Sequence, residues 1–439
     1  MLACSGTPQD SAPVEADADT DADADTDVET GWTEFTPSED TVIVYVSAEG
    51  DDANSGLSED EPLASIAAGK ALLRHEAPDW LLLRAGDSWD EGLGQWKTGG
   101  RSAEEPQLVG VWGEGARPLL NAPATGLQTN LGGSSPTSID HLAFVGLHLV
   151  APEDRVPGVQ WLVGTQGLLF EDMVFEGFSV NAVIQDFDGY GQADVSFRRS
   201  HFLDAYDPGG HSQGLYADGT DGLLIEQCLF DHNGWRDGVA DPTKFNHDIY
   251  LQTGIDGVVM RGNIVARASS HGAQLRNGGE ARDNLFLDNS IAYFLAHNDD
   301  GDDIATRLVS VDNAVIGCSM KAMSGDGESR GWGVEVTGVE GVEDVEVSGN
   351  IVAHCPDGTA AFEVEQDDGG NVVWDWGGES STGDFKDTSC TVATYSAWIG
   401  GEESLEAFLA EVRAQKRGHW RKEYTAEVAV DYFQDCYSE

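Results

Sequence analysis

The chain has 439 residues, with 78 Asp and Glu against 24 Lys and Arg, so its formal net charge at pH 7 is -54. Such acidity argues against a nucleic-acid partner and against an anionic membrane surface, because both are bound through basic patches. No apolar run approaches the about 20 residues that a transmembrane helix requires. The length is large for one compact core but ordinary for a solenoid, whose core grows by repetition.

The first 40 residues are predicted to form an anchored, disordered tether. Leu2 to Gly6 (LACSG) is similar to the end of a bacterial lipoprotein signal, in which the cysteine, here Cys4, is lipidated after cleavage. The charged and apolar regions that normally precede such a cysteine are missing from this sequence. Residues 15–30 are an Ala/Asp/Thr tract that cannot bury a core. We therefore expect an exported protein, lipid-anchored at the cell surface or in the periplasm, or secreted.

The segment after the tether begins with strand and helix signals. Residues 41–47 (TVIVYVS) predict a strand, Pro62 opens an amphipathic helix, and residues 80–87 (WLLLRAGD) predict a buried strand that ends in a turn. The stretches YVSAEGDDANSGLSEDEPLASIAAGKALL and WLLLRAGDSW resemble the entry to right-handed parallel β-helix proteins of the pectate-lyase-like type. This resemblance implies an all-β solenoid over residues 41–375, with the short helix capping its open end.

A repeat in the residues themselves predicts the same architecture. The segments FVGLHLV, FEDMVFE, FRRSHFL, IEQCLFD, MRGNIVA, ARDNLFL, VDNAVIG and VSGNIVA align at spacings of 21 to 37 residues, about one turn of a three-stranded parallel β-helix. One column of this alignment holds Leu147, Met173, Ser200, Cys228, Asn263, Asn284, Asn313 and Asn350. The four asparagines predict a ladder in which each amide bonds to the next coil. Long loops are expected at residues 233–246 and 317–332, where a binding groove would find its walls.

The cysteines and the last 64 residues are interpreted together. Cys318 and Cys355 each follow a column asparagine by five residues, so they should face each other on neighbouring coils as a disulfide. Cys390 and Cys436 are assigned to a second disulfide within residues 376–439, a segment expected to cover the other end or one flank. This segment contains an amphipathic helix at 404–416 with Ser404 as its N-cap. Cys228 is expected to be a packed free thiol.

Three short lines of sequence predict the functional site: HSQGLYAD (211–218), NHDIYLQ (246–252) and HGAQLR (271–276). Each alternates apolar with polar residues, as a strand with one buried face does. Stacked strands would then display their polar side chains in columns. The candidate catalytic residues are His247, His271, Tyr250, Arg276 and Lys244. The candidate substrate-binding residues are Gln213, Tyr216, His232, Asn233, Trp235, Asn246, Gln252 and Gln274, with DHNGW (231–235) beginning a loop that is expected to fold over the columns.

These residue types fit β-elimination in a polysaccharide that contains uronic acids. Arg276, Lys244 or a bound Ca²⁺ would neutralise the C5 carboxylate, and His247 or His271 would take the C5 proton. Tyr250 or the other histidine would protonate the leaving oxygen, and Trp235 would stack on a sugar face. Two close histidines disfavour double protonation, which keeps one of them neutral as a base. No cofactor is certain from the sequence. The expected partner is a polysaccharide, and we expect a monomer.

Other functions remain open on the same fold. A glycoside hydrolase would need two carboxyl groups, for which Asp218, Asp231, Asp248 and Glu280 are candidates, but these acids do not recur in the columns as the histidines do. Zinc on the two histidines lacks a third ligand at convincing spacing. Residues 299–303 (DDGDD) lack the spacing and the closing Glu of an EF-hand and predict a turn. A tethered protein that binds glycans without cleaving them is the third alternative, because fold alone does not choose among them.

Overall fold

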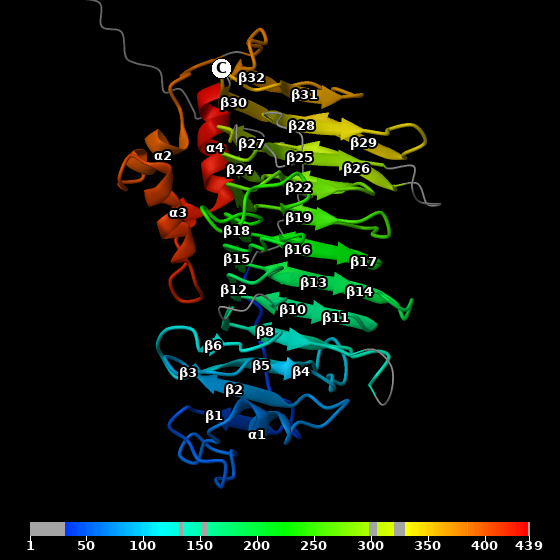
Figure 1. Cartoon of the computed structure of the whole chain (residues 1–439), viewed down its shortest axis with the longest axis vertical. Coiled ribbons are helices and arrows are strands. Elements are labelled where there is room, and N and C mark those ends of the chain that lie inside the picture. Colours follow the sequence, from blue (N-terminus) through cyan, green and yellow to red (C-terminus); the bar gives the residue numbers. More distant parts are fainter. Residues whose placement is uncertain are drawn as a thin grey trace, which may run out of the picture. The chain divides into compact units, whose positions relative to one another are not determined.

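The computed structural model describes residues 31–130, 135–151, 156–297, 305–319, 330–383 and 385–437. Cys4, the acidic tract at 15–30 and the predicted turn at 299–303 lie outside the described residues. From Thr36 onward the chain forms one compact unit, built from three parallel sheets (Figure 1). Successive strands along the chain belong to different sheets and pair with the equivalent strand of the next coil. The predicted parallel β-helix is confirmed.

Sheet A contains, in spatial order, β1 (Ile43–Val46), β2 (Trp80–Arg84), β5 (Gln107–Trp112), β8 (Leu142–Val145), β11 (Thr165–Glu171), β14 (Gln192–Arg198), β17 (Thr220–Glu226), β20 (Val259–Arg261), β23 (Gly279–Arg282), β26 (Arg307–Val311) and β29 (Asp344–Ser348). Sheet B contains β3 (Ser88–Trp89), β6 (Leu119–Asn121), β9 (His148–Val150), β12 (Val174–Glu176), β15 (His201–Leu203), β18 (Leu229–Asp231), β21 (Ile264–Ala266), β24 (Leu285–Leu287), β27 (Ala314–Ile316), β30 (Ile351–Cys355) and β32 (Val372–Trp376). Sheet C contains β4 (Gly94–Gln95), β7 (Leu127–Gln128), β10 (Val159–Trp161), β13 (Ala182–Gln185), β16 (Gln213–Asp218), β19 (His247–Leu251), β22 (His271–Leu275), β25 (Ile291–Ala296), β28 (Trp332–Thr337) and β31 (Ala360–Val364).

The predicted column lies at the short turn between sheet A and sheet B. In each coil the residue before the column residue has a left-handed backbone, with φ between 47° and 79°. Gly and Asp adopt this conformation more readily than most residues and dominate the position. The residues in the left-handed conformation are Gly146, Asp172, Arg199, Gln227, Gly262, Asp283, Asp312 and Gly349.

The asparagines of the column form the predicted ladder. Asn263, Asn284, Asn313 and Asn350 are fully buried, and each side-chain amide donates to the Oδ1 of the next asparagine at 2.9–3.0 Å. The ladder continues one coil further, to Asn371. Each Oδ1 also accepts the backbone N–H of the preceding coil, so the ladder satisfies polar groups that would otherwise be buried without partners at the bend.

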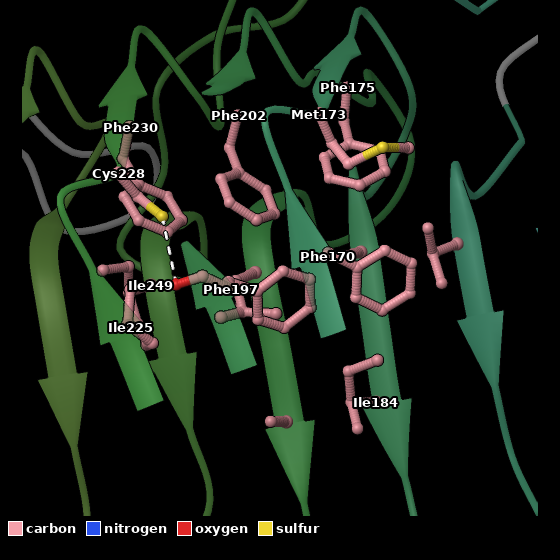
Figure 2. Packing of buried hydrophobic residues seen from close by; sticks show 14 of the residues in the cluster. Phe170, Met173, Phe175, Ile184, Phe197, Phe202, Ile225, Cys228, Phe230 and Ile249 are labelled. Atoms are coloured by element: carbon pink, nitrogen blue, oxygen red, sulfur yellow. Dashed lines mark hydrogen bonds between the residues drawn. The ribbon is translucent and has the colours of Figure 1, made fainter. Parts of the chain in front are cut away.

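Aromatic rings fill the interior in register with the coils. Phe170 stacks on Phe197 with ring centres 4.9 Å apart, and Phe202 stacks on Phe230 at 4.4 Å (Figure 2). Such stacks repeat because equivalent strands pair residue for residue. Cys228 lies beside these rings as a buried free thiol, as predicted.

Helices close one end and one flank of the solenoid. The predicted N-terminal helix begins at Ile66 rather than Pro62, and α1 (Ile66–Lys70) packs beside β1 at the first coil (Figure 1). The C-terminal helices are α2 (Val392–Trp398), α3 (Leu405–Arg413), the 3-10 helix η1 (Lys422–Tyr424) and α4 (Ala426–Tyr437). Their apolar faces form a second core with the outer face of sheet B, so the helical C-terminal segment covers a flank, as predicted. Ser404 caps α3, and the disulfides Cys318–Cys355 and Cys390–Cys436 are both present.

Candidate functional site

The three predicted lines of sequence are neighbouring strands of sheet C. Strands β16, β19 and β22 pair in parallel, with Tyr216 opposite Tyr250 and Tyr250 opposite Gln274. Leu215, Ile249 and Ala273 face the core. The register is the one that the sequence alignment implies, so residues far apart in the chain share one outer face.

A bend at the start of each strand turns the histidines to that outer face. Strict alternation would put His247 on the same side as Ile249, yet the imidazole of His247 lies 5.0 Å from the ring of half-buried Tyr250. The reason is that the next position along the strand also faces inward. Asp248 is fully buried there, and a Cβ at Gly214, its counterpart on β16, would lie 3.1 Å from the Phe230 ring. With two successive residues turned inward, the residue before them points outward.

Four predicted catalytic side chains make a continuous row of contacts. The rings of His247 and His271 are 5.1 Å apart, and His247 contacts Tyr250. Arg276 donates from Nη1 to the phenol oxygen of Tyr250 at 3.2 Å and to Oε1 of Gln252 at 2.9 Å. The row therefore places two imidazoles, a phenol and a guanidinium on one face of two neighbouring coils.

The environment keeps both imidazoles neutral at ordinary pH. Burial lowers the pKa of His247 well below its usual range, and the neighbouring His271 and His211 lower it further. Burial lowers the pKa of His271 to about 3, with a smaller contribution from the charge of Arg330. His247 is only 4% exposed, and its Nδ1 is buried with no hydrogen-bond partner among the described residues. Buried polar atoms without a partner are uncommon in folded proteins.

Three predicted substrate-binding residues are instead part of the scaffold. Asn233 and Asn246 are fully buried: Asn233 donates to Asp248 and to the carbonyl of Phe202, and Asn246 bonds to backbone groups of the neighbouring turn. Gln213 is 3% exposed and donates to the carbonyl of Phe245 at 3.1 Å. Their direct contact with a polymer is not supported, because their amides serve the backbone of the bend.

The beginning of the long loop lies elsewhere than predicted. His232 bonds to Asp204 at 2.8 Å and packs on Trp235, which is 8% exposed and donates to the carbonyl of Arg267. They line a pocket of about 530 Å³ with residues from the ends of sheet B strands. The expectation that DHNGW folds over the columns is therefore not supported. The fifth predicted catalytic residue, Lys244, makes no contact with the row among the described residues: it is exposed, and its ammonium lies 5.4 Å from the ring of Phe245.

The four predicted carboxylates of a glycoside hydrolase are dispersed. Asp218 lies on sheet C, Asp231 is buried against Arg267 and Arg413, Asp248 is in the core, and Glu280 is on sheet A. A pair that the sequence reasoning missed is Glu335 and Glu363, directly opposite each other on β28 and β31. Burial and then the charge of Glu363 raise the pKa of Glu335 to about 7.

Phe245 is the other residue that sequence reasoning missed. The residue is 51% exposed, and it comes immediately before the buried Asn246 and two residues before His247. An aromatic residue in an otherwise polar loop (DPTKFNH) was the signal that could have found it. A metal site is not supported by the described ranges, where no group of three or more His, Cys, Asp or Glu could hold an ion. Within the same ranges, no helix has the length and apolarity to cross a membrane.

The chain matches no protein-family model and no curated protein. Among solved structures it is similar to pectate lyase Pel9A, at 15% identity and a TM-score of 0.50, over 84% of this chain and 87% of that chain. It is also similar to a rhamnogalacturonan lyase, at 13% identity and a TM-score of 0.47, over 74% of this chain and 87% of that one. It is also similar to an alginate lyase from a Paenibacillus species, at 14% identity and a TM-score of 0.38, over 76% of this chain and 97% of that one. At these identities the likeness to Pel9A shows the parallel β-helix fold alone.

Proposed function

We propose that this protein is a polysaccharide lyase that cleaves a uronic-acid polymer by β-elimination on the outer face of sheet C. The observation that carries the proposal is the row of two neutral imidazoles, a phenol and a guanidinium. A base, an acid and a cation are what β-elimination next to a carboxylate requires. The β-helix fold shared with a pectate lyase is compatible with this activity.

The roles follow from exposure and hydrogen bonding. His271 is more exposed than His247 and takes the C5 proton, while Nδ1 lies 3.2 Å from the hydroxyl of Ser270. In the tautomer whose Nδ1–H donates to Ser270, Nε2 presents its lone pair to the substrate. Burial, and then the charge of Arg330, lower the pKa of His271 and so keep the base unprotonated between turnovers.

Arg276 and Tyr250 act on the two oxygens that gain charge. The guanidinium of Arg276 neutralises the C5 carboxylate, which makes the C5 proton easier to remove. Because Arg276 donates to the phenol oxygen of Tyr250, the phenol proton is not used in that bond and is available to the leaving oxygen. The C5–H bond breaks, its electrons form the C4–C5 double bond, the C4–O bond breaks, and Tyr250 protonates the released oxygen.

Ultraviolet absorbance of the unsaturated product tests the proposal across alginate, polygalacturonate and other uronic polymers. We expect wild-type protein to produce this absorbance, and His271→Ala to lower kcat about 100-fold or more, because a general base contributes that much. His148→Ala is the control, since His148 lies on sheet B and pairs with Glu176. Full turnover by His271→Ala with an unchanged circular dichroism spectrum would exclude the row from catalysis.

Glycoside hydrolysis is the second candidate function, and Glu335 with Glu363 favours it. The two carboxyl groups lie on neighbouring parallel strands, and the pKa of Glu335 is raised to about 7. Glu335 could therefore act as the general acid and Glu363 as the nucleophile. New reducing ends without unsaturated product, lost in Glu335→Gln and retained in His271→Ala, would support this function over the lyase.

The proposed setting is outside the cytoplasm. The two disulfides are typical of exported proteins, and a polymeric substrate is met there. We also propose the lipid anchor at Cys4 and a monomeric state. Metabolic labelling with a radioactive fatty acid, comparing the wild-type protein with Cys4→Ser, tests the anchor.

A further inference from the structure

The end of the long loop, residues 243–246, holds an exposed aromatic ring beside the row of catalytic candidates. Phe245 is 51% exposed, whereas most large apolar side chains of this fold are buried. Asn246 separates it from His247, the first residue of β19. The ring stacks on His211, whose charge acts on His247, so the ring lies near the row.

Residues on three sides hold this part of the loop in place. Thr243 exchanges two hydrogen bonds with the hydroxyl of Ser269, at 2.7 and 2.9 Å. The Phe245 carbonyl accepts from Gln213 at 3.1 Å, and the buried amide of Asn246 bonds across the turn. These bonds fix the backbone before and after Phe245, so its exposed ring is held at a defined place on the surface. Such preorganisation lowers the entropic cost of binding a ligand.

The ring also has a defined orientation. The imidazole of His211 stacks on it, with ring centres 5.3 Å apart and planes 15° from parallel. On this strongly acidic chain, the loop places a cation at the same spot: the Lys244 ammonium lies 5.4 Å from the centre of the ring. An aromatic ring with a cation over it combines an apolar surface with a positive charge, and this matches a uronic acid, which has a C–H face and a carboxylate.

We propose that Phe245 and Lys244 form a binding subsite for a hexuronate residue adjacent to the one that is cleaved. The sugar's C–H face packs on the Phe245 ring, and its carboxylate pairs with Lys244, which exchanges its contact with the ring for the ion pair. Gln213 and His211 position the ring without touching the sugar. This subsite rests on the proposed lyase function, and it moves Lys244 from a catalytic role to a binding role.

The experiment compares Phe245→Ala, Lys244→Gln and wild type on alginate, polygalacturonate and the neutral polymer dextran. Steady-state rates and affinity electrophoresis are measured with full-length protein. For the uronic polymer that wild type cleaves, we expect Phe245→Ala to raise KM about tenfold with little change in kcat, since aromatic contacts are worth about that much. Lys244→Gln should raise KM about threefold, and the rise should shrink at high salt because an exposed ion pair is screened. Val239→Ala, at a 50% exposed position in the same loop, is the matched control.

The outcomes separate the subsite from the lyase proposal. If wild type cleaves a uronic polymer and both variants keep its KM, the subsite is wrong and the lyase stands. If Phe245→Ala and Val239→Ala raise KM equally, the effect belongs to the loop and the subsite is also wrong. If the wild-type protein cleaves neither uronic polymer and neither polymer slows its migration, both proposals are wrong. If dextran slows the migration of the wild-type protein and Phe245→Ala abolishes this effect, the assignment of the subsite to a uronate is wrong.

Discussion

Removing one asparagine from the middle of the ladder should destabilise the fold far more than removing one at its end. Asn313 is fully buried, and its amide donates to the carbonyl of Ala281 at 2.8 Å and to Asn350 at 3.0 Å. Its Oδ1 accepts both the backbone N–H and the side-chain amide of Asn284. Alanine at position 313 deletes these four bonds and leaves a buried carbonyl and a buried backbone N–H without partners.

Each of the two groups costs about 1–3 kcal/mol, so Asn313→Ala should lower the free energy of unfolding by about 2–6 kcal/mol. Asn371→Ala is the matched control: Asn371 also takes part in four hydrogen bonds, but it is only half-buried and water can replace its amide. It should cost about 1 kcal/mol or less. Urea denaturation followed by circular dichroism measures both. Equal losses in the two variants would refute the argument that burial sets the cost.

Three further predictions concern charge, covalent links and pH. Burial raises the pKa of Asp248 well above its usual range. The folded state therefore keeps a proton that the unfolded state releases above about pH 4. The contribution of Asp248 to the free energy of unfolding is complete below that pH and is lost as the pH rises through the folded-state pKa. Asp248→Asn should therefore raise the melting temperature at pH 8 and leave it nearly unchanged at pH 4, and parallel curves for the two proteins would contradict this. The double change Cys318→Ala and Cys355→Ala opens a link of sequence separation 37 and should cost about 3–4 kcal/mol in urea denaturation; no loss would show that the link does not constrain the unfolded chain. Because the pKa of His271 is lowered to about 3, kcat/KM should stay level from about pH 8 to about pH 5. With a base of pKa 6.5, kcat/KM would instead fall about 30-fold by pH 5. A half-maximal kcat/KM near pH 6.5 would rule His271 out as the base.

The architecture could be predicted because each repeat carries residue types that have a defined structural role at the same position of every coil. The asparagine column, the left-handed Gly and Asp before it, and the cysteines at matched offsets each imply stacked coils. The columns of sheet C followed once the coils were aligned. What the alignment could not supply was the path of the long loop, since nothing periodic constrains its 14 residues from 233 to 246.

Burial at the bends was the second failure of sequence reasoning. Asn233 and Asn246 were assigned to the substrate because polar loop residues beside a sheet are usually exposed. Both instead satisfy backbone groups at the turn between sheets B and C, as the ladder does at the turn between sheets A and B. A turn between two sheets must bury its own amides, and asparagine is suited to do so. The same residue type therefore has a structural role wherever a coil bends.

The bend that hides these asparagines also creates the chemistry of the row. Two inward residues in succession, Asp248 and Ile249, rotate His247 outward but leave it wedged against the turn, 4% exposed. A half-sealed imidazole loses its hydration, and the adjacent imidazole of His271 adds repulsion, so both effects favour the neutral base. An imidazole in the flat middle of the strand, where Tyr250 is, would be more solvated and closer to its ordinary pKa. His271 begins β22 as His247 begins β19, but it is half-buried rather than sealed, so the start of its strand keeps the proposed base both accessible and unprotonated.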